Sequence, residues 1–572
     1  MSTKEMEPPT EQPTVSQPST PTLPSKENEN PHEYPSAGKL WLLMLSLYMS
    51  MFLISLDKTI IATAIPQITN SFNSLSDIGW YGSSYMLTLC AFQLVWGRIY
   101  TFYSPKTVFL TTIFIFEVGS AICGAAPSST GFIIGRAIAG MGSAGISNGA
   151  IILVMHTVPL EKRPMFQGFI GAVFGVASVV GPLLGGVFTQ KLSWRWCFYI
   201  NLPLGAVSAA VLILFLRLPK RKEEEKVPLR TQIKKLDPIG TAVFLPSIVC
   251  LLLALQWGGT TYPWSNWRII LLLVLFPLLF AAFMALQICY PDTATLPLRI
   301  LTQRTVFSGF FYAFTSQASV LVITYYIPLF FQALKDFSPV SSGFAILPSV
   351  LTLVIGAMVA GGLVQRFGYP APFMYISCIL SAVGAGMIST WPISATTRVW
   401  IGYQVLFGLG IGLGMQQPSI SVQCVLPRPD VSMGISLMFF GQNLGGAVFI
   451  STAQNVFVDT LARKLSEIPG VGITRQMVVE MGATQLVKLV GEELRETVLE
   501  GYHVAIRNAF YVGVGLSCVS LIGALGVEWV SVKKGEKMGS AGKDEKKEVG
   551  GDKLAAEEEG RKGEKEVVDR EV

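Results

Sequence analysis

Charged residues are scarce in this chain. Asp, Glu, Lys and Arg make up 14% of the 572 residues, whereas soluble globular proteins carry about 25%. Hydrophobic residues make up 51%, and runs such as 269–288 and 350–364 contain few polar groups. A helix needs about 20 predominantly apolar residues to cross a bilayer, and the alternation over about ten residues that marks a transmembrane β-barrel is missing. We therefore predict an all-α polytopic protein embedded in a lipid bilayer.

Histidine is rarer still, with three residues, His32, His156 and His503, that lie far apart in the sequence. They do not assemble a metal site, and no glycine-rich phosphate-binding loop with its lysine is present. Both absences argue against an enzyme and against an ATP-driven pump. The basic residues form no stripe with interleaved aromatic residues, so no nucleic-acid partner is expected. The eight cysteines lie in or beside apolar segments, which indicates small buried side chains rather than a disulfide framework.

The apolar segments predict fourteen spans. They cover residues 40–65, 78–100, 107–126, 131–156, 165–189, 196–217, 238–257, 267–290, 305–331, 342–365, 371–391, 398–420, 432–458 and 504–531. The predicted parts of the chain are a disordered cytosolic N-tail at 1–38, an N-terminal six-helix bundle at 39–217, a basic cytosolic loop at 218–237, two extra transmembrane helices at 238–290, a C-terminal six-helix bundle at 303–531 with a long extracellular loop at 459–503, and a charged, disordered cytosolic C-tail at 532–572.

Lys and Arg residues are unevenly distributed among the connections. They gather in the connections on the side of the two termini, above all in 218–237, and are few in the short connections on the other side. Cytosolic loops of membrane proteins carry such an excess of positive charge. We therefore expect both termini in the cytosol of a multi-pass protein of the cell membrane, with the vacuolar or a vesicle membrane as the alternative.

Two segments of the chain are similar to each other. The segment "RAIAGMGSAG" begins at Arg136 and "QVLFGLGIGLG" begins at Gln404; aligned on their first residues, they share glycines at the fifth and seventh positions. Upstream of each, a glycine-led span end runs into a short loop, at 97–104 and at 361–368. Transporters are often built from such internal repeats. Spans 1–6 therefore correspond to spans 9–14, which predicts two six-helix halves with two inserted central helices.

Four charged residues lie clearly within the membrane, away from the ends of the first six predicted spans. Asp57 and Lys58 are adjacent in the first span, Glu117 is in the third and Arg136 is near the start of the fourth. Such residues are costly in a bilayer and usually mark pathways or relays. Asp57 is either a helix-packing acid or a carboxylate that exchanges protons, and Glu117 has the same two alternatives. Lys58 is expected to reach outwards, and Pro66 to mark the outer end of the helix.

The motifs together resemble one family. "LDKTIIATAIPQIT" looks like the first-span signature of the 14-span drug:proton antiporters of the major facilitator superfamily, and "GRAIAGMGSAG" resembles the arginine motif of the fourth span. "GVASVVGPLLGG" at 175–186 resembles the fifth-span antiporter motif, and "SWRWCFYINLPLG" at 193–205 is typical of fungal members. The resemblance implies the major facilitator fold and a secondary active transporter that exports a mycotoxin, secondary metabolite or drug. It also implies a proton gradient as the driving force, no cofactor, and a monomer. A proton-coupled importer and a non-transport receptor remain as alternatives.

The resemblance also implies the functional residues. The proton-coupling or gating residues are Asp57, Arg136 and Glu117, and the antiporter motif contains Gly181, Pro182, Gly185 and Gly186. The expected walls of the substrate cavity are Asn148, Gln317, Tyr325, Tyr326, Gln404, Gln416 and Gln417, whose amides and aromatic rings suit amphipathic small molecules. The loop motif after the second span departs from the family, because Thr101 and Phe102 replace its Asp-Arg pair. What remains of the motif and of its second copy is Gly97, Lys106, Arg366 and Gly368.

Overall fold

The computed structural model describes residues 35–74, 77–217, 232, 235–259, 261–291, 293–467 and 492–533. Within this part of the chain, thirteen helical segments are long and apolar enough to cross a bilayer. Helix α2 (Ile78–Phe102) falls outside that group but packs against α4 and α18 in the middle of the bundle. With α2 included, the described helices match the predicted all-α architecture of fourteen spans.

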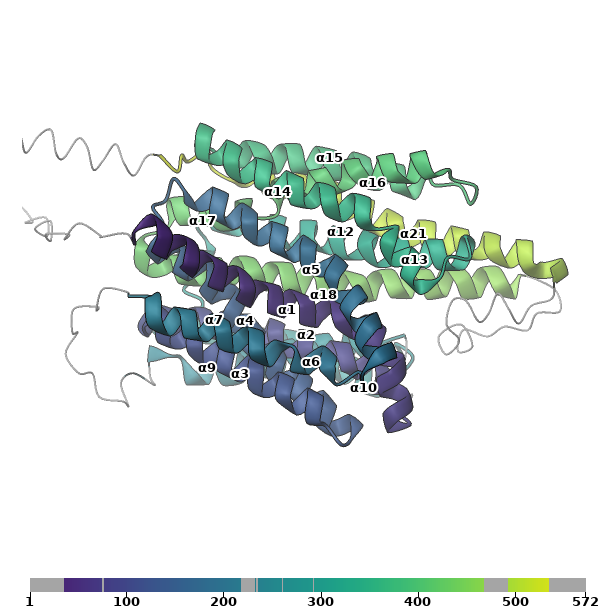
Figure 1. The fold of residues 1–572 in the computed structure, drawn as a ribbon, viewed down its shortest axis with the longest axis horizontal. Coiled ribbons are helices and arrows are strands. Elements are labelled where there is room, and N and C mark those ends of the chain that lie inside the picture. Colours follow the sequence, from purple (N-terminus) through teal and green to yellow (C-terminus); the bar gives the residue numbers. More distant parts are fainter. Residues whose placement is uncertain are drawn as a thin grey trace, which may run out of the picture.

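The first six spans form the N half. They are α1 (Ala37–Phe72), α2, α3 (Pro105–Ala125), α4 (Ser129–Thr157), α5 (Arg163–Lys191), and the short α6 (Trp196–Tyr199) continued by α7 (Asn201–Phe215). An inserted hairpin follows, made of α9 (Pro238–Trp257) and α10 (Trp267–Cys289), and then the one-turn α11 (Leu298–Leu301). Figure 1 shows the N half and the hairpin in purple to teal on one side of the molecule.

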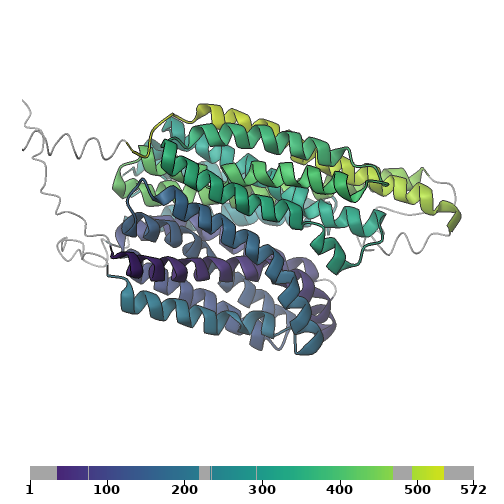
Figure 2. The same ribbon diagram turned by 45° about the horizontal axis from the view of Figure 1, so that its top comes forward.

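The last six spans form the C half. They are α12 (Arg304–Leu334), α13 (Pro339–Phe344) continued by α14 (Leu347–Phe367), α15 (Ala371–Ser389), α16 (Thr397–Gly414) continued by α17 (Gln417–Val425), α18 (Arg428–Ser466) and α21 (Glu492–Gly526). The two halves lie side by side with roughly parallel helix axes (Figures 1 and 2). We call the end of the bundle where α1 begins and α21 ends the terminal side, and the opposite end, where α1 ends and α15 connects to α16, the loop side.

Three helices are longer than the sequence predicts. α1 continues through Pro66 to Phe72, so the prediction that Pro66 ends this helix is wrong. α18 extends past residue 458 to Ser466, and α21 begins at Glu492 rather than at 504. The apolar length fixes only the part of a helix that crosses the bilayer, and charged turns such as Arg463 and Lys464 continue it into water. Most of the two predicted tails, most of the loop at 218–237 and residues 468–491 of the predicted extracellular loop lie outside the described residues.

The internal repeat has the same contacts in both halves. A Cβ on Gly140 would collide with the Tyr85 carbonyl of α2, and a Cβ on Gly408 would collide with the Ser349 carbonyl of α14. The next aligned pair shows the same agreement. A Cβ on Gly142 would meet the backbone of Phe116 where α4 crosses α3, and a Cβ on Gly410 would meet the backbone of Ser381 where α16 crosses α15. The glycines let neighbouring helices approach closely. The alignment read from the sequence therefore holds in three dimensions.

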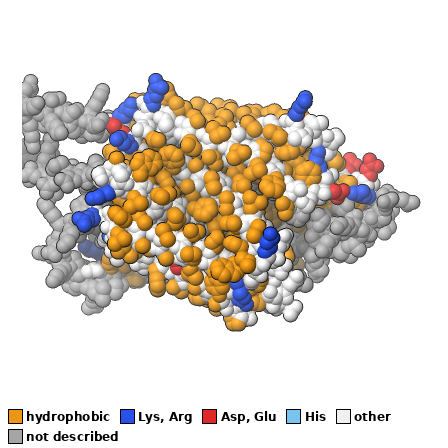
Figure 3. Space-filling view, in the orientation of Figure 1, with side chains coloured by type: hydrophobic (Ala, Val, Ile, Leu, Met, Phe, Trp, Pro, Cys, Tyr) orange, Lys and Arg blue, Asp and Glu red, His pale blue; other side chains and the backbone are white. Residues whose placement is uncertain are grey.

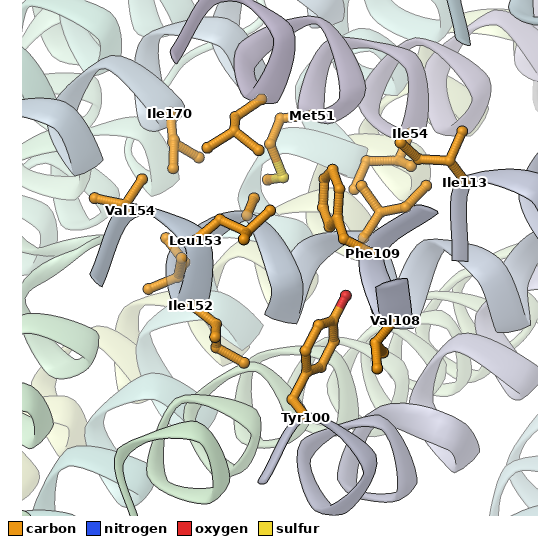
Figure 4. Packing of buried hydrophobic residues seen from close by; sticks show 14 of the residues in the cluster. Met51, Ile54, Tyr100, Val108, Phe109, Ile113, Ile152, Leu153, Val154 and Ile170 are labelled. Atoms are coloured by element: carbon orange, nitrogen blue, oxygen red, sulfur yellow. The ribbon is translucent and has the colours of Figure 1, made fainter. Parts of the chain in front are cut away.

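Apolar side chains cover the flank of the molecule as well as its interior. Figure 3 shows hydrophobic side chains over the whole flank and most Lys and Arg side chains toward the two ends. The interior of the N half is a buried cluster to which α1, α3, α4 and α5 contribute Met51, Phe109, Leu153 and Ile170 (Figure 4). An apolar flank between charged ends is what a bilayer requires of a multi-span protein.

The side-chain carboxylate of Asp237 holds the inserted hairpin in place at the terminal side. Asp237, directly before α9, accepts hydrogen bonds from the Gly240 amide (2.8 Å), the Gln287 amide of α10 (2.7 Å), and the Thr295 amide and hydroxyl (3.0 and 2.9 Å). The backbone of Asp237 is left-handed, with φ at +52°. Hydrogen bonds to a charged acceptor are the stronger kind. This carboxylate therefore joins both helices of the hairpin to the connection that leads into the C half.

Replacing Asp237 by alanine is expected to destabilise the hairpin, because four buried donors lose their acceptor at once. We expect a loss of about 2–4 kcal/mol in unfolding free energy, and faster proteolysis at the terminal side of the hairpin in the purified protein. Asp336→Ala is the matched control: Asp336 also has φ at +52°, but its ion pair with Arg495 is exposed. Exposed pairs contribute little. Equal effects of both substitutions would contradict this role of Asp237.

Candidate functional site

Asp57 and Arg136 form an ion pair inside the N half. Nη1 of Arg136 lies 2.5 Å from Oδ2 of Asp57, and the two side chains are 0% and 1% exposed. Asp57 lies about 30 Å from the start of α1, and Arg136 lies in the second turn of α4. A buried pair is strongly destabilised when one partner is removed. The two motifs identified in the sequence thus meet in one contact.

Further polar groups hold this pair in place. Nε of Arg136 donates to the Tyr81 carbonyl at 3.0 Å, and the guanidinium carbon lies 4.4 Å from the centre of the Tyr85 ring. On the other side, the Asn201 amide lies 3.4 Å from Oδ1 of Asp57. Arginine suits such a site because its planar fork stays charged and also stacks on aromatic rings. α1, α2, α4 and α7 therefore all contribute to one buried charged cluster.

Glu117 lies behind this cluster, in the groove between α3 and α7. Its carboxylate packs against Gly205, where a Cβ would collide with Oε1. Neither oxygen of Glu117 has a hydrogen-bond partner among the described residues. Ser120, one turn further along α3, accepts from the Asn201 amide at 3.1 Å. Glu117 is thus a neighbour of the Asp57–Arg136 pair but not a ligand of it.

The C half contains an uncharged copy of the arginine position. Gln404, which aligns with Arg136, donates from Nε2 to the Ala345 carbonyl at 2.9 Å. Ala345 lies one turn before Ser349, as Tyr81 lies one turn before Tyr85 in the N half. Gln404 is fully buried in this position, and its predicted place in the wall of the substrate cavity stays a prediction. The two halves share an architecture, but the described ion pair at this position belongs to the N half.

The antiporter motif brings α5 against α1. Cβ atoms on Gly181 and Gly185 would collide with the hydroxyls of Thr59 and Thr63 in α1, whereas nothing lies within 4 Å of a Cβ on Gly186. Pro182 lies inside α5, which remains helical through it. Close approach of the two helices therefore requires a glycine at positions 181 and 185 but not at position 186. This part of the motif serves packing within the N half and not contact between the halves.

The halves meet through another set of small residues, which the sequence analysis missed. A Cβ on Gly168 of α5 would lie 2.7 Å from the Ala357 carbonyl of α14, and one on Gly361 would lie 2.6 Å from the Pro164 carbonyl. Gly97 of the loop motif lies against Ser436 of α18 in the same way. Gly97, Gly361 and Pro164 lie near the terminal-side ends of their helices. The terminal side of the interface is therefore closed in this structure.

The three predicted cavity residues of α12 differ in their surroundings. Gln317 lines a small polar cavity inside the C half, together with side chains of α12, α15, α16, α18 and α21 that include Tyr312, Ser316, Ser377, Ser381 and Gln442. Tyr325 is 52% exposed, whereas Tyr326 is fully buried against Phe457. The hydroxyl of Tyr326 has no hydrogen-bond partner among the described residues. Tyr326 belongs to the buried hydrophobic cluster of the C half in this conformation, and its assignment to a cavity wall stays a prediction.

Three predicted amides are engaged within the protein. Asn148 donates to the Gln93 carbonyl at 2.8 Å and accepts from the Gln93 amide at 2.5 Å, so it joins α4 to α2. Gln417 is 1% exposed and donates to the Leu413 carbonyl near the end of α16, while Gln416 is 7% exposed beside Gly171 of α5. None of the three is an open cavity wall in this conformation.

The remaining loop-motif residues lie at helix ends. Lys106 donates from Nζ to the Ile213 and Leu216 carbonyls at the end of α7, at 2.9 and 2.7 Å. A lysine at a helix C-terminus interacts favourably with the helix dipole. Gly368 ends α14 with φ at +94°, and the carbonyl of Arg366 accepts from Lys533 at 2.6 Å. Each of these contacts stabilises one helix end, and each lies within one half of the protein.

Asn201 is a side chain of the buried charged cluster that the sequence analysis missed. It connects Asp57 to Ser120, and it stands within the apolar segment "CFYINLPLG". An amide in an apolar span usually needs a hydrogen-bond partner there. That signal alone would have marked Asn201, although not its partner.

Comparison with known proteins identifies similar transporters. The profile of the Major Facilitator Superfamily matches residues 47–450. The MFS-type efflux pump MFS1 of Arthroderma benhamiae is 50% identical over 495 residues, which cover 86% of this chain and 92% of that protein. The efflux pump aflT of Aspergillus parasiticus is 46% identical over 499 residues, covering 87% and 97% of the two chains. Both similarities span nearly the whole of the described helices.

Solved structures agree on the fold. The human organic anion transporter MFSD10 superposes with a TM-score of 0.53 over 82% of this chain and 99% of its own, at 14% identity. The proton:xylose symporter XylE superposes with a TM-score of 0.53 over 86% and 95% of the two chains, at 12% identity. At these identities the likeness concerns the arrangement of helices alone.

Proposed function

The chain belongs to the major facilitator superfamily, within the fungal MFS-type transporters and efflux pumps, and on that premise we propose that it exports amphipathic small molecules in exchange for protons. It is a membrane transporter and not an enzyme. Relatives that are 50% and 46% identical over most of the chain carry the name efflux pump. This similarity supports outward transport of toxins, secondary metabolites or drugs.

The buried pair of Asp57 and Arg136 is the observation that carries the proton part of the proposal. The pair is enclosed within one half, and the matching position of the other half holds the neutral Gln404. A guanidinium beside a carboxylate favours the charged form of the carboxylate. Movement of α4 relative to α1 would lengthen this contact and make Asp57 easier to protonate. Proton uptake and release would thereby be coupled to the conformation of the N half.

The proposed transport cycle proceeds by alternating access. The described conformation is closed on the terminal side, where α5 meets α14 and α2 meets α18. With the termini in the cytosol, as the distribution of Lys and Arg suggests, this side faces the substrate before export. The proposal includes a monomer in the cell membrane, with an internal membrane as the alternative location, and no cofactor besides the proton gradient.

Transport by inside-out vesicles tests the proposal. With the vesicle interior made acidic, a panel of fungal metabolites and drugs is expected to include compounds that accumulate several-fold inside wild-type vesicles. Collapse of the gradient by a protonophore is expected to abolish this accumulation. Vesicles without the protein are the control. Accumulation that is insensitive to the protonophore would contradict proton antiport, and no transport of any compound would contradict export.

A proton-coupled importer with the same fold is the second candidate. Deletion of the gene separates the two directions in intact cells. An exporter predicts a higher intracellular concentration of its substrate after deletion, and an importer predicts a lower one.

A further inference from the structure

Lys58 is a charged residue at membrane depth that takes no part in the Asp57–Arg136 pair. Its side chain makes no hydrogen bond and no ion pair with any described residue. α1 continues from Lys58 to Phe72, which is about 20 Å of helix. That length is beyond the reach of a lysine side chain, so Lys58 does not reach the end of its own helix, and the expectation that it reaches outwards to the membrane surface stays a prediction. An ionisable residue within a span usually has a functional role.

The neighbours of Lys58 indicate which way it faces. Successive helical residues are about 100° apart. Asp57 faces α4, and Thr59 faces α5, where its hydroxyl donates to the Ala177 carbonyl at 3.1 Å. Leu45, which is 59% exposed near the closed terminal side, faces the lipid and is about 140° away from Lys58 around the helix. Lys58 therefore lies on the face of α1 between α4 and α5, which is directed toward the C half.

The surfaces opposite Lys58 carry no charge. No Asp, Glu, Lys, Arg or His occurs at residues 305–334, 337–365, 399–427 or 431–458, which form the spanning parts of α12, α14, α16, α17 and α18. The same is true of 78–97 in α2 and 164–190 in α5. The pair of Asp57 and Arg136 is enclosed, and Glu117 lies behind it against α7. Among the described spanning residues that face the space between the halves, Lys58 is the one that carries a formal charge.

We propose that Lys58 binds an acidic oxygen of the exported molecule, such as a carboxylate or a phenolate, in the space between the halves. The inference rests on the proposed export function and names its substrate class. A lone ammonium in a surface without fixed negative charge attracts anions and repels cations. Weakly acidic amphiphiles are therefore the preferred substrates, and organic cations are not.

The test uses two dyes of one scaffold and opposite charge. Proton-driven uptake of fluorescein, an anion, and of rhodamine 123, a cation, is measured in inside-out vesicles that contain the wild-type protein. Wild type is expected to transport fluorescein and to exclude rhodamine 123. Lys58→Gln is expected to raise the KM for fluorescein about 10- to 100-fold, with a much smaller change in kcat. Lys58→Arg is expected to restore the KM, and Lys58→Glu to admit rhodamine 123.

Lys39→Gln is the matched control, because it removes a lysine from the exposed first turn of the same helix. It is expected to leave both dyes unaffected. An unchanged KM for fluorescein in Lys58→Gln, or transport of neither dye by wild type, would overturn the proposal. Transport of rhodamine 123 alone would also overturn it while leaving proton-driven export intact. Failure of the whole metabolite panel is the separate result that would overturn the export function itself.

Discussion

Asp57→Asn is expected to abolish proton-driven export, with a loss of at least about 100-fold in the initial rate. Asparagine keeps the shape of the side chain but cannot release a proton, and it leaves the charge of Arg136 buried without a counter-charge. Removing one partner of a buried pair costs about 3–5 kcal/mol, so the variant is also expected to melt at a lower temperature. The measurements are pH-driven uptake in inside-out vesicles and thermal unfolding of the purified protein.

A second variant separates loss of coupling from loss of stability. The double substitution Asp57→Asn with Arg136→Gln removes both charges, and replacement of a buried pair by neutral groups is often nearly neutral in stability. Gln404 shows that a glutamine at this position of the repeat can bind the neighbouring carbonyl in place of arginine. We expect the melting temperature to recover and the coupling to remain absent. Wild-type export by either variant would contradict the role of the pair.

Gly361→Leu is expected to hold the terminal side of the interface open and to lower the transport rate about tenfold or more. A Cβ at this position would lie 2.6 Å from the Pro164 carbonyl and 3.1 Å from Cα of Met165, both on α5. Backbone atoms cannot yield as a flexible side chain would, so α14 and α5 would have to separate. The variant would still bind substrate from the terminal side but would not complete the cycle. Vesicle transport at matched expression measures the loss.

Gly362→Leu is the matched control, because nothing lies within 4 Å of a Cβ at the next position of the same helix. It is expected to transport at the wild-type rate. Alkylation of Cys424 in α17, in a background without the other cysteines, reports the opening of the terminal side. Labelling is expected to rise in Gly361→Leu and to stay unchanged in Gly362→Leu. Equal rates and equal labelling in the two variants would show that this contact does not gate transport.

Most of the architecture was predictable because it follows from two strong signals. The length of each apolar run identifies the spans, and the glycines of the fourth and twelfth spans reveal the repeat. Helix ends were less predictable, because nothing in the apolar pattern says how far α1 continues past Pro66 or how far α18 continues into water. Helix existence is therefore readable from hydropathy, whereas helix length also depends on the polar turns beyond the membrane.

The site was predictable in its charges and not in its neutral groups. Asp57 and Arg136 stand out because charge is rare in a span, and they prove to be in contact. Gln404 and Tyr326 looked like cavity walls because amides and aromatic rings often line cavities, but both are buried within the C half. The sequence shows which side chains are polar but not which face of a helix they occupy.

The buried contact between the Asp57 carboxylate and the Arg136 guanidinium has a thermodynamic consequence for export. If one carboxylate carries one proton in each cycle, the proton-motive force sets a ceiling on accumulation. A membrane potential of about 100 mV and a gradient of about one pH unit together supply about 3.7 kcal/mol per proton. That free energy sustains a concentration ratio of about 500-fold for a neutral molecule. A molecule that leaves as an anion adds its own electrical work to the cycle, so acidic substrates would reach steeper gradients than neutral ones.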